Sequence, residues 1–160
     1  MQVCKIPEER VEKLQKNLDR FKRALNCEIV IKDNQIVITS QNSFNEYIAR
    51  NVIIAFGRGF SIDDALELCR EDKYFKLIEL QDYAKNRNQL VRIKSRVIGR
   101  KGRVKKEIER LTGAKIAIYG KTIALIGGEQ ELKSAEDALI RIITGSKQSN
   151  VLRLLQLKKI

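Results

Sequence analysis

The most informative part of the sequence is VIGRKGRVKKEIERLTGAK, which runs from Val97 to Lys115. Two glycines, Gly99 and Gly102, enclose an Arg-Lys pair, and the apolar residues Val104 and Ile108 then follow at helical spacing. Glycine lets the backbone turn tightly and approach a ligand without a Cβ in the way. The start of a helix offers unpaired N–H groups and the positive end of the helix dipole, which both suit a phosphate. The spacing therefore predicts a basic, phosphate-binding turn between two helices.

Other phosphate motifs do not describe this turn. The P-loop pattern G-x-x-x-x-G-K-[ST] is absent. A dinucleotide fingerprint needs a third glycine and a long parallel β-α-β array, and the sequence provides neither. The basic residues, with acids four positions away, also fit a plain solvated helix or a nuclear-import signal, but neither explains the two glycines.

The positive charge of the chain is unevenly distributed. The formal net charge is +12. Residues 89–160 hold 17 Lys and Arg against 6 Asp and Glu, whereas residues 1–88 hold 15 against 14. Such a surplus in one half favours a polyanionic partner, and a solvated charged face of a very stable protein is the alternative.

Composition argues against an enzyme and against a membrane protein. The chain has no histidine, which removes imidazole bases and most zinc sites, so we expect no metal and no cofactor. The acids Asp63 and Asp64 follow Ser61, as expected at a helix start. The longest apolar run, 52–56, is far shorter than the ~20 residues of a membrane span. Three widely spaced cysteines predict buried free thiols in a reducing cytoplasm.

The sequence repeats itself, which indicates a tandem duplication. QVCKIPEERVEKLQ, from Gln2, aligns with QLVRIKSRVIGRKG, from Gln89, at a constant offset of 87. The same offset superposes the apolar positions of two later predicted strands, and VIIAFG at 52–57 matches IRIITG at 140–145 one residue further on.

Each copy reads as β-α-α-β-β-α with one further helix, an α+β fold. The first strand is expected at 3–6 and 90–94, and a brief helix at 8–14 and 96–98 leads to the second helix. Hairpins are expected at 28–39 and 115–126, with two-residue turns. Long helices are expected at 44–56 and 130–144, and the further helices at 62–70 and 149–157.

Residues 89–143 resemble a type I K-homology (KH) domain. VRIKSRVIGRKGRVKKEIERLTGAKIAI follows the strand, helices and strand entry of that family, and Gly99-Arg100-Lys101-Gly102 matches its GXXG loop. Arg103 replaces a glycine that is common in the family. The resemblance implies a groove that clamps about four unpaired nucleotides at their phosphates and holds the bases on an aliphatic floor. A chain with only 6% aromatic residues fits this mode better than aromatic stacking.

The expected RNA-binding residues are the loop, its basic neighbours, the floor and the nearby hairpin. They are Arg96, Ile98, Gly99, Arg100, Lys101, Gly102, Arg103, Lys105, Lys106, Ile116, Ile118, Tyr119 and Lys121. The floor residues, with Val104, also suit a plain hydrophobic core. In the first copy Glu12-Lys13-Leu14-Gln15 aligns with the loop, so we expect a degenerate KH domain with a structural or protein-binding role.

The pairing of a degenerate KH domain, expected at 1–80, with a GXXG-bearing one, expected at 81–160 with a C-terminal helix, resembles a particular group. It is similar to the archaeal form of the partner-of-Nob-one family, tandem-KH factors of small ribosomal subunit maturation. The related Krr-type factors usually have an eroded GXXG loop. The absence of a tail before the first strand also suits the archaeal form. We expect the two domains to pack as one rigid unit.

The resemblance implies a cytoplasmic, non-enzymatic protein that binds single-stranded RNA near the 3′ end of small-subunit rRNA. The implied protein partners are the Nob endonuclease or another ribosome-assembly or initiation protein. Two alternatives stay open: a KH regulator of other RNAs, and a protein adaptor for a ribosome-processing nuclease.

Overall fold

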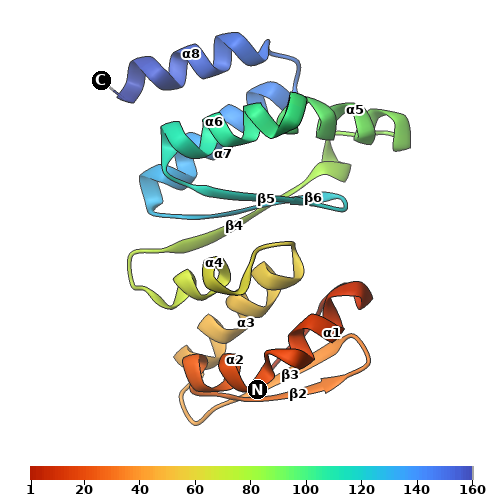
Figure 1. The fold of residues 1–160 in the computed structure, drawn as a ribbon, viewed down its shortest axis with the longest axis vertical. Coiled ribbons are helices and arrows are strands. Elements are labelled where there is room, and N and C mark those ends of the chain that lie inside the picture. Colours follow the sequence, from red (N-terminus) through yellow and green to blue (C-terminus); the bar gives the residue numbers. More distant parts are fainter. Residues whose placement is uncertain (160) are drawn as a thin grey trace. The chain divides into compact units, whose positions relative to one another are not determined.

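Two units of the same topology form the computed structural model, which describes residues 1–159 (Figure 1). The chain divides into Met1–Glu71 and Asp72–Ile160. Each unit has a three-stranded antiparallel sheet whose last strand lies in the centre, in the orders β1-β3-β2 and β4-β6-β5. The expected order β-α-α-β-β-α, followed by a further helix, is confirmed in both units.

The first unit builds its core between its sheet and its helices. Its elements are β1 (Gln2–Lys5), α1 (Glu8–Lys16), α2 (Leu18–Leu25), β2 (Glu28–Lys32), β3 (Gln35–Thr39), α3 (Ser43–Gly57), α4 (Ile62–Leu66) and the short 3₁₀ helix η1 (Glu67–Cys69). Ile36 and Ile38 of β3 are fully buried. The rings of Phe21 and Phe56 meet edge to face with centroids 5.4 Å apart, which fixes α2 against α3.

The second unit is layered, with the sheet on one side and helices on the other (Figure 1). Its elements are β4 (Tyr74–Glu79), η2 (Leu80–Asp82), α5 (Arg87–Ile98), η3 (Arg100–Gly102), α6 (Arg103–Thr112), β5 (Lys115–Tyr119), β6 (Thr122–Gly127), α7 (Glu129–Ile143) and α8 (Gln148–Lys159). Helices α5, α6 and α7 cover one face of the sheet, and α8 packs on α6 and α7 as the outermost layer.

Alternation along β6 shows which face of this sheet is the core. Ile123 and Leu125 belong to one hydrophobic cluster with residues of α5, α6 and α7. Because successive side chains point to opposite faces of a sheet, Ala124 and Ile126 lie on the face away from these helices. Both faces of the central strand are therefore apolar.

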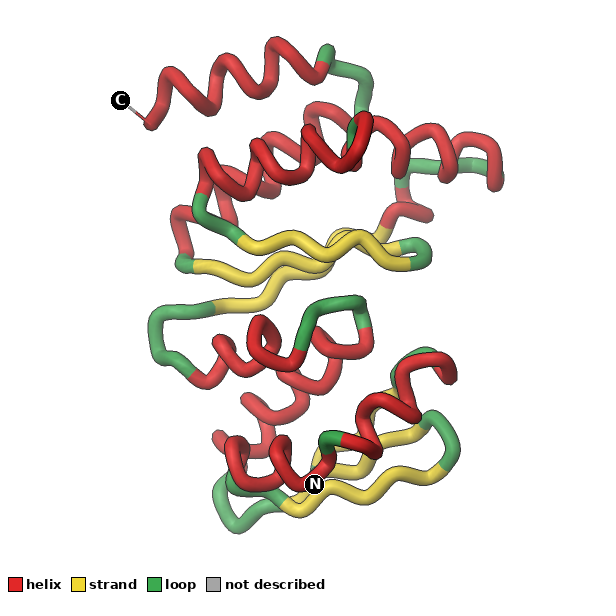
Figure 2. The backbone as a smooth tube through the Cα atoms, in the orientation of Figure 1, coloured by secondary structure: helices red, strands yellow, loops and turns green. Residues whose placement is uncertain are grey.

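The prediction of a strand at 90–94 is wrong. These residues lie inside α5, and the first strand of the second sheet is β4, which pairs with β6 (Figure 2). Leu90, Ile93 and Val97 are three and four residues apart, which is the spacing of a helix facing the core. The side chain of Asn86 starts this helix by accepting a hydrogen bond from the Gln89 N–H at 2.9 Å.

The domain boundary was expected between residues 80 and 81. In the structure the two units meet in the sequence between Glu71 and Asp72, before β4. The offset of 87 residues aligns the two copies correctly only from the second helix onwards. There it places β2 on β5 and β3 on β6. The second copy is longer before that point, since α5 has 12 residues and α1 has 9.

The residues expected to form a degenerate loop in the first copy are helical. Residues 12–15 lie within α1, and Leu14 is fully buried. A single residue, Asn17, separates α1 from α2. The first unit therefore has no loop at the position of the GXXG turn.

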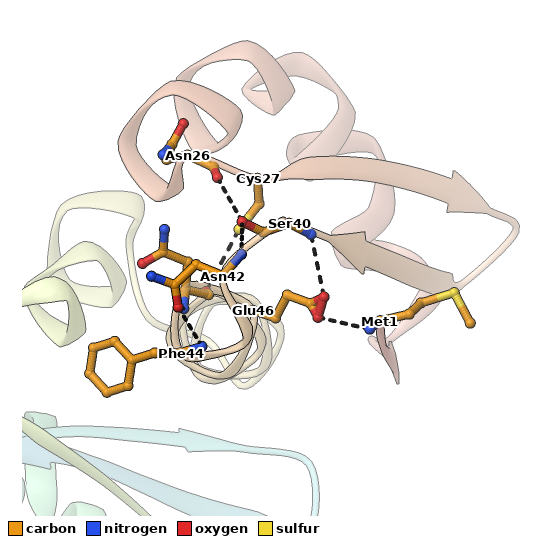
Figure 3. A network of polar contacts seen from close by, with 8 residues as sticks. Met1, Asn26, Cys27, Ser40, Asn42, Phe44 and Glu46 are labelled. Atoms are coloured by element: carbon orange, nitrogen blue, oxygen red, sulfur yellow. Dashed lines mark hydrogen bonds and ion pairs between the residues drawn. The ribbon is translucent and has the colours of Figure 1, made fainter.

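A polar network holds the start of α3 in the first unit (Figure 3). The Asn42 side chain accepts a hydrogen bond from the Phe44 N–H at 2.8 Å. The buried Glu46 carboxylate accepts bonds from the Ser40 N–H at 3.3 Å and from the amino group of Met1 at 2.8 Å. The bond from this amino group lowers the pKa of Glu46 below its ordinary value of 4.5, so the buried acid is charged at neutral pH.

All three cysteines are free, but they are not all buried as expected. Cys4 and Cys27 are buried, whereas Cys69 is exposed. Burial raises the pKa of the Cys4 thiol to about 11, so this thiol stays protonated at neutral pH.

Candidate nucleic-acid interface

The turn between α5 and α6 has an unusual backbone. Gly99, Lys101 and Gly102 adopt φ values of 75°, 57° and 73°. Residues with a Cβ rarely adopt such values, which explains why glycine stands at both ends of the turn. The Gly99 N–H donates to the Ser95 carbonyl at 2.9 Å and closes α5. The predicted glycine turn between two helices is therefore confirmed.

The helix that follows the turn begins without a side-chain cap. Gly102 is its N-cap residue and has no side chain that accepts a hydrogen bond from the first turn of α6. The first amides of a helix have no partner within the helix. Together with the helix dipole, they provide a seat for an anion next to the loop.

Four cations surround this seat. Arg100, Lys101, Arg103 and Lys106 are exposed on the loop and the first turn of α6. No ion pair that the structure contains within residues 1–159 involves them. Their charge is thus available to a ligand.

Two other predicted cations already have partners. The Arg96 guanidinium donates to the Ser146 carbonyl at 2.7 Å, and the Gln148 side chain donates to the Arg96 carbonyl at 2.6 Å. Arg96 therefore fastens the connection between α7 and α8 to α5, so we assign it a structural role. Lys105 pairs with Glu109 at 3.2 Å.

The expected aliphatic floor is partly core. Val104 and Ile116 are 6% and 3% exposed and belong to the main hydrophobic cluster, against which Ile118 packs half-buried. Ile98 is half-buried at the end of α5. Of the predicted floor residues, only Ile98 and Ile118 have appreciable exposed surface.

The hairpin residues lie at the far end of β5. Tyr119 is half-buried as the last residue of that strand, and Lys121 is exposed in the two-residue turn. The Lys121 carbonyl accepts a hydrogen bond from the Leu80 N–H at 2.8 Å, which fixes the turn against η2.

Glu109 lies on the helix after the glycine turn and has contacts that sequence reasoning did not predict. Its carboxylate accepts a hydrogen bond from the backbone N–H of Ile116 at 3.0 Å, between α6 and β5. It also pairs with Lys105, one turn earlier on the same helix. The spacing of four residues was the available signal, but it equally describes an exposed pair. Glu107 and Arg110 form such a pair nearby, and their hydrogen bond raises the pKa of Arg110.

Neither a membrane helix nor a metal cluster is found among the residues that the structure describes. No helix there combines the length and the apolar character that crossing a bilayer requires. No group of three or more His, Cys, Asp or Glu side chains in the same part of the chain is arranged to hold a metal ion.

The strand order, the two helices and the Gly-x-x-Gly turn between them together define a type I KH domain. The family model for the second KH domain of PNO1 proteins, a eukaryotic-type KH domain (KH-domain type I), matches residues 74–159. The chain belongs to this family, in agreement with the resemblance seen in the sequence.

Three known proteins illustrate the similarity. A KH domain-containing protein of Methanocaldococcus jannaschii is 29% identical over 98% of this chain and 73% of its own length. The pre-rRNA-processing protein pno1 of Aspergillus oryzae is 33% identical over 61% of this chain, which spans only 38% of that protein. A crystal structure of an a/eIF2alpha-aDim2p-rRNA complex from Pyrococcus horikoshii OT3 has a chain that is 31% identical, with a TM-score of 0.91 over 99% of this chain and 93% of that one.

Proposed function

We propose that this protein is a non-enzymatic RNA-binding factor in the maturation of the small ribosomal subunit, and that its second KH domain clamps single-stranded rRNA near the 3′ end. The observation that carries the proposal is the uncapped start of α6 beside the glycine turn. Phosphates approach the backbone there because Gly102 has no side chain and leaves open space, and Arg100 and Lys101 supply charge.

The known relatives support the choice of RNA. The fungal relative is a pre-rRNA-processing protein, and the archaeal structural neighbour forms a complex that includes rRNA. The first unit lacks a glycine turn, and its charge is nearly balanced. We therefore assign RNA binding to the second unit and a structural or protein-binding role to the first.

A protein partner is part of the proposal. Because the structural neighbour is found with a/eIF2alpha, we propose an initiation-factor subunit as one partner and a processing nuclease of the Nob type as another. Free cysteines suit the cytoplasm as the place of action. Affinity purification followed by binding assays with each purified candidate distinguishes the two partners.

Crosslinking in cells tests the RNA assignment directly. The protein is crosslinked to RNA, purified under denaturing conditions, and the attached RNA is sequenced. We expect reads concentrated at the 3′ region of small-subunit rRNA. Reads spread over messenger or small RNAs would instead favour a KH regulator, and the absence of crosslinked RNA would favour a protein adaptor.

Salt dependence tests the clamp. For single strands, the slope of log K against log salt is about −0.7 per phosphate contacted. Contacts to about three to five phosphates then give a slope of about −2 to −3.5. If the RNA affinity does not change with salt concentration, the protein does not clamp phosphates. The positive charge of residues 89–160 then has another function.

A further inference from the structure

A pocket of about 510 Å³ lies at the start of α5, at the end of that helix away from the glycine turn. Residues of η2, of the segment that follows it, of the first turn of α5 and of the β5–β6 turn line this α5 pocket. Ala84 and Leu90 supply its apolar surface and pack against the main hydrophobic cluster. The volume falls within the range of about 300–1,000 Å³ that is typical of small-molecule sites, so a nucleotide fits.

Hydrogen bonds fix the walls of the α5 pocket. The Lys121 carbonyl accepts from the Leu80 N–H at 2.8 Å, which joins the β5–β6 turn to η2. The Gln89 side chain accepts from the Lys85 N–H at 2.7 Å, while the Asn86 side chain caps the Gln89 N–H. The pocket is thus formed before a ligand arrives. Because the start of α5 is already capped, the charge of the pocket comes from side chains.

Three cations line the α5 pocket, and none of the described residues that line it is acidic. Lys85, Arg87 and Lys121 come from different segments, and all three are exposed. No ion pair between residues 1 and 159 involves them. Positive side chains around an apolar surface suit a ligand that has phosphates and a flat ring, which is the chemistry of a nucleotide.

One face of α5 connects the α5 pocket with the glycine turn. Leu90, Lys94 and Ile98 follow one another at intervals of four residues, so they lie on the same side of the helix, where all three are half-buried. Ile98 ends α5 directly before Gly99. The 12 residues of α5 span about 18 Å, which about five nucleotides cover at a spacing of about 3.4 Å, and fewer if the strand is extended. A strand clamped at the glycine turn therefore reaches the pocket.

We propose that the α5 pocket is a second nucleotide site, which holds the same RNA strand about five nucleotides or fewer from the phosphates at the glycine turn. Lys85, Arg87 and Lys121 bind the phosphates beside a nucleotide that lies against Ala84 and Leu90. The inference rests on the proposed function, because one strand occupies both places. Contacts to phosphates and to an apolar surface carry no sequence information, so the pocket lengthens the bound segment without selecting a base.

RNAs of two lengths test the second site on the full chain. The probes are segments of about four and about twelve nucleotides from the 3′ region of small-subunit rRNA, the shorter of which matches the length expected for the clamp alone. We expect Lys85→Ala/Arg87→Ala to bind the longer RNA about tenfold more weakly than the wild type, as two exposed charge contacts predict. Its affinity for the shorter RNA should be unchanged. The salt slope for the longer RNA should be smaller by about 1.4, or about 0.7 per phosphate.

Arg153→Ala/Lys158→Ala is the matched control. It removes the same charge from exposed positions of α8, which packs on α6 and α7. It should leave both affinities unchanged. If this control weakens the longer RNA as much as the pocket variant does, or if the pocket variant weakens both RNAs equally, a general loss of positive charge explains the effect and the proposal is wrong. Unchanged affinity of the pocket variant for the longer RNA also overturns it and makes an acidic protein segment the better ligand.

An NMR titration of the wild-type protein tests the site without mutation. We expect the amide signals of Lys85, Arg87 and Lys121 to shift with the longer RNA but not with the shorter one. The signals of Gly99 and Gly102 should shift with both. Shifts at the glycine turn alone, with either RNA, contradict a second site and leave the clamp standing. Failure of the wild-type protein to bind either RNA overturns the proposed function itself, which distinguishes the two failures.

Discussion

Gly99 and Gly102 share a positive φ but differ in their surroundings. A Cβ at Gly99 would lie 2.8 Å from both the backbone nitrogen and the Cβ of Val104, which is closer than real Cβ atoms come to such atoms. A Cβ at Gly102 would meet only the end of Lys106, at 3.8 Å. Gly99 is thus needed for the fold, whereas Gly102 leaves open space beside the start of α6.

Alanine substitutions separate these two roles. We expect Gly99→Ala to lower the free energy of unfolding by about 3 kcal/mol, because it combines a strained φ with a clash against Val104. Gly102→Ala should lower it by only about 1 kcal/mol, since only the φ is unfavourable. Urea denaturation measures both values. Equal losses for the two variants would contradict the distinct surroundings of the two glycines.

Spacing alone predicted the loop, but not the partners of the residues around it. Gly-x-x-Gly before a helical pattern is local information, and the structure places these residues as expected. The bond of Arg96 to Ser146 and that of Glu109 to Ile116 join residues that are distant in the sequence or lie on different elements. No periodicity or charge pattern encodes such contacts.

At the scale of elements, hairpins and long helices were predictable because turn residues and periodicity agree there. The first strand of the second unit was not. Leu90, Val91 and Ile93 fit either a strand or one side of a helix, and the assumed constant offset favoured the strand. The alternating, aromatic-containing YFKLIE at 74–79 is the true strand.

Asn86 provides a test of α5 as a helix. Asn86→Ala removes the acceptor for the Gln89 N–H, and loss of such a cap typically lowers the free energy of unfolding by about 1 kcal/mol. Thermal or urea unfolding measures the change, and Asn88→Ala, inside the first turn, serves as the control. If this region were a strand, Asn86→Ala and Asn88→Ala would change the free energy of unfolding equally.

At the scale of the whole molecule, we predict that the two units move as one body. Only residues 70–73 join η1 to β4. This connection has no Gly, Pro or Ser.

NMR relaxation tests this prediction. A single rotational correlation time, as expected for one particle of 18.4 kDa, should describe both units. Two clearly different correlation times would show that the units rotate independently and would contradict the prediction.

The central claim is that the glycine turn and the start of α6 clamp RNA phosphates. Replacing both Arg100 and Lys101 by Asp puts negative charge at the seat, while exposed substitutions usually change stability by only about 0.5 kcal/mol. Lys13→Asp, on the exposed side of α1 in the first unit, is the matched control.

The decisive measurement is the RNA affinity of these two variants, after unchanged melting has been verified for each. Loss of two charged contacts, at about 1.5 kcal/mol each, predicts binding about a hundredfold weaker for the Arg100→Asp/Lys101→Asp protein. Lys13→Asp should bind as the wild type does. If the folded double variant binds RNA with wild-type affinity, the phosphate clamp does not exist.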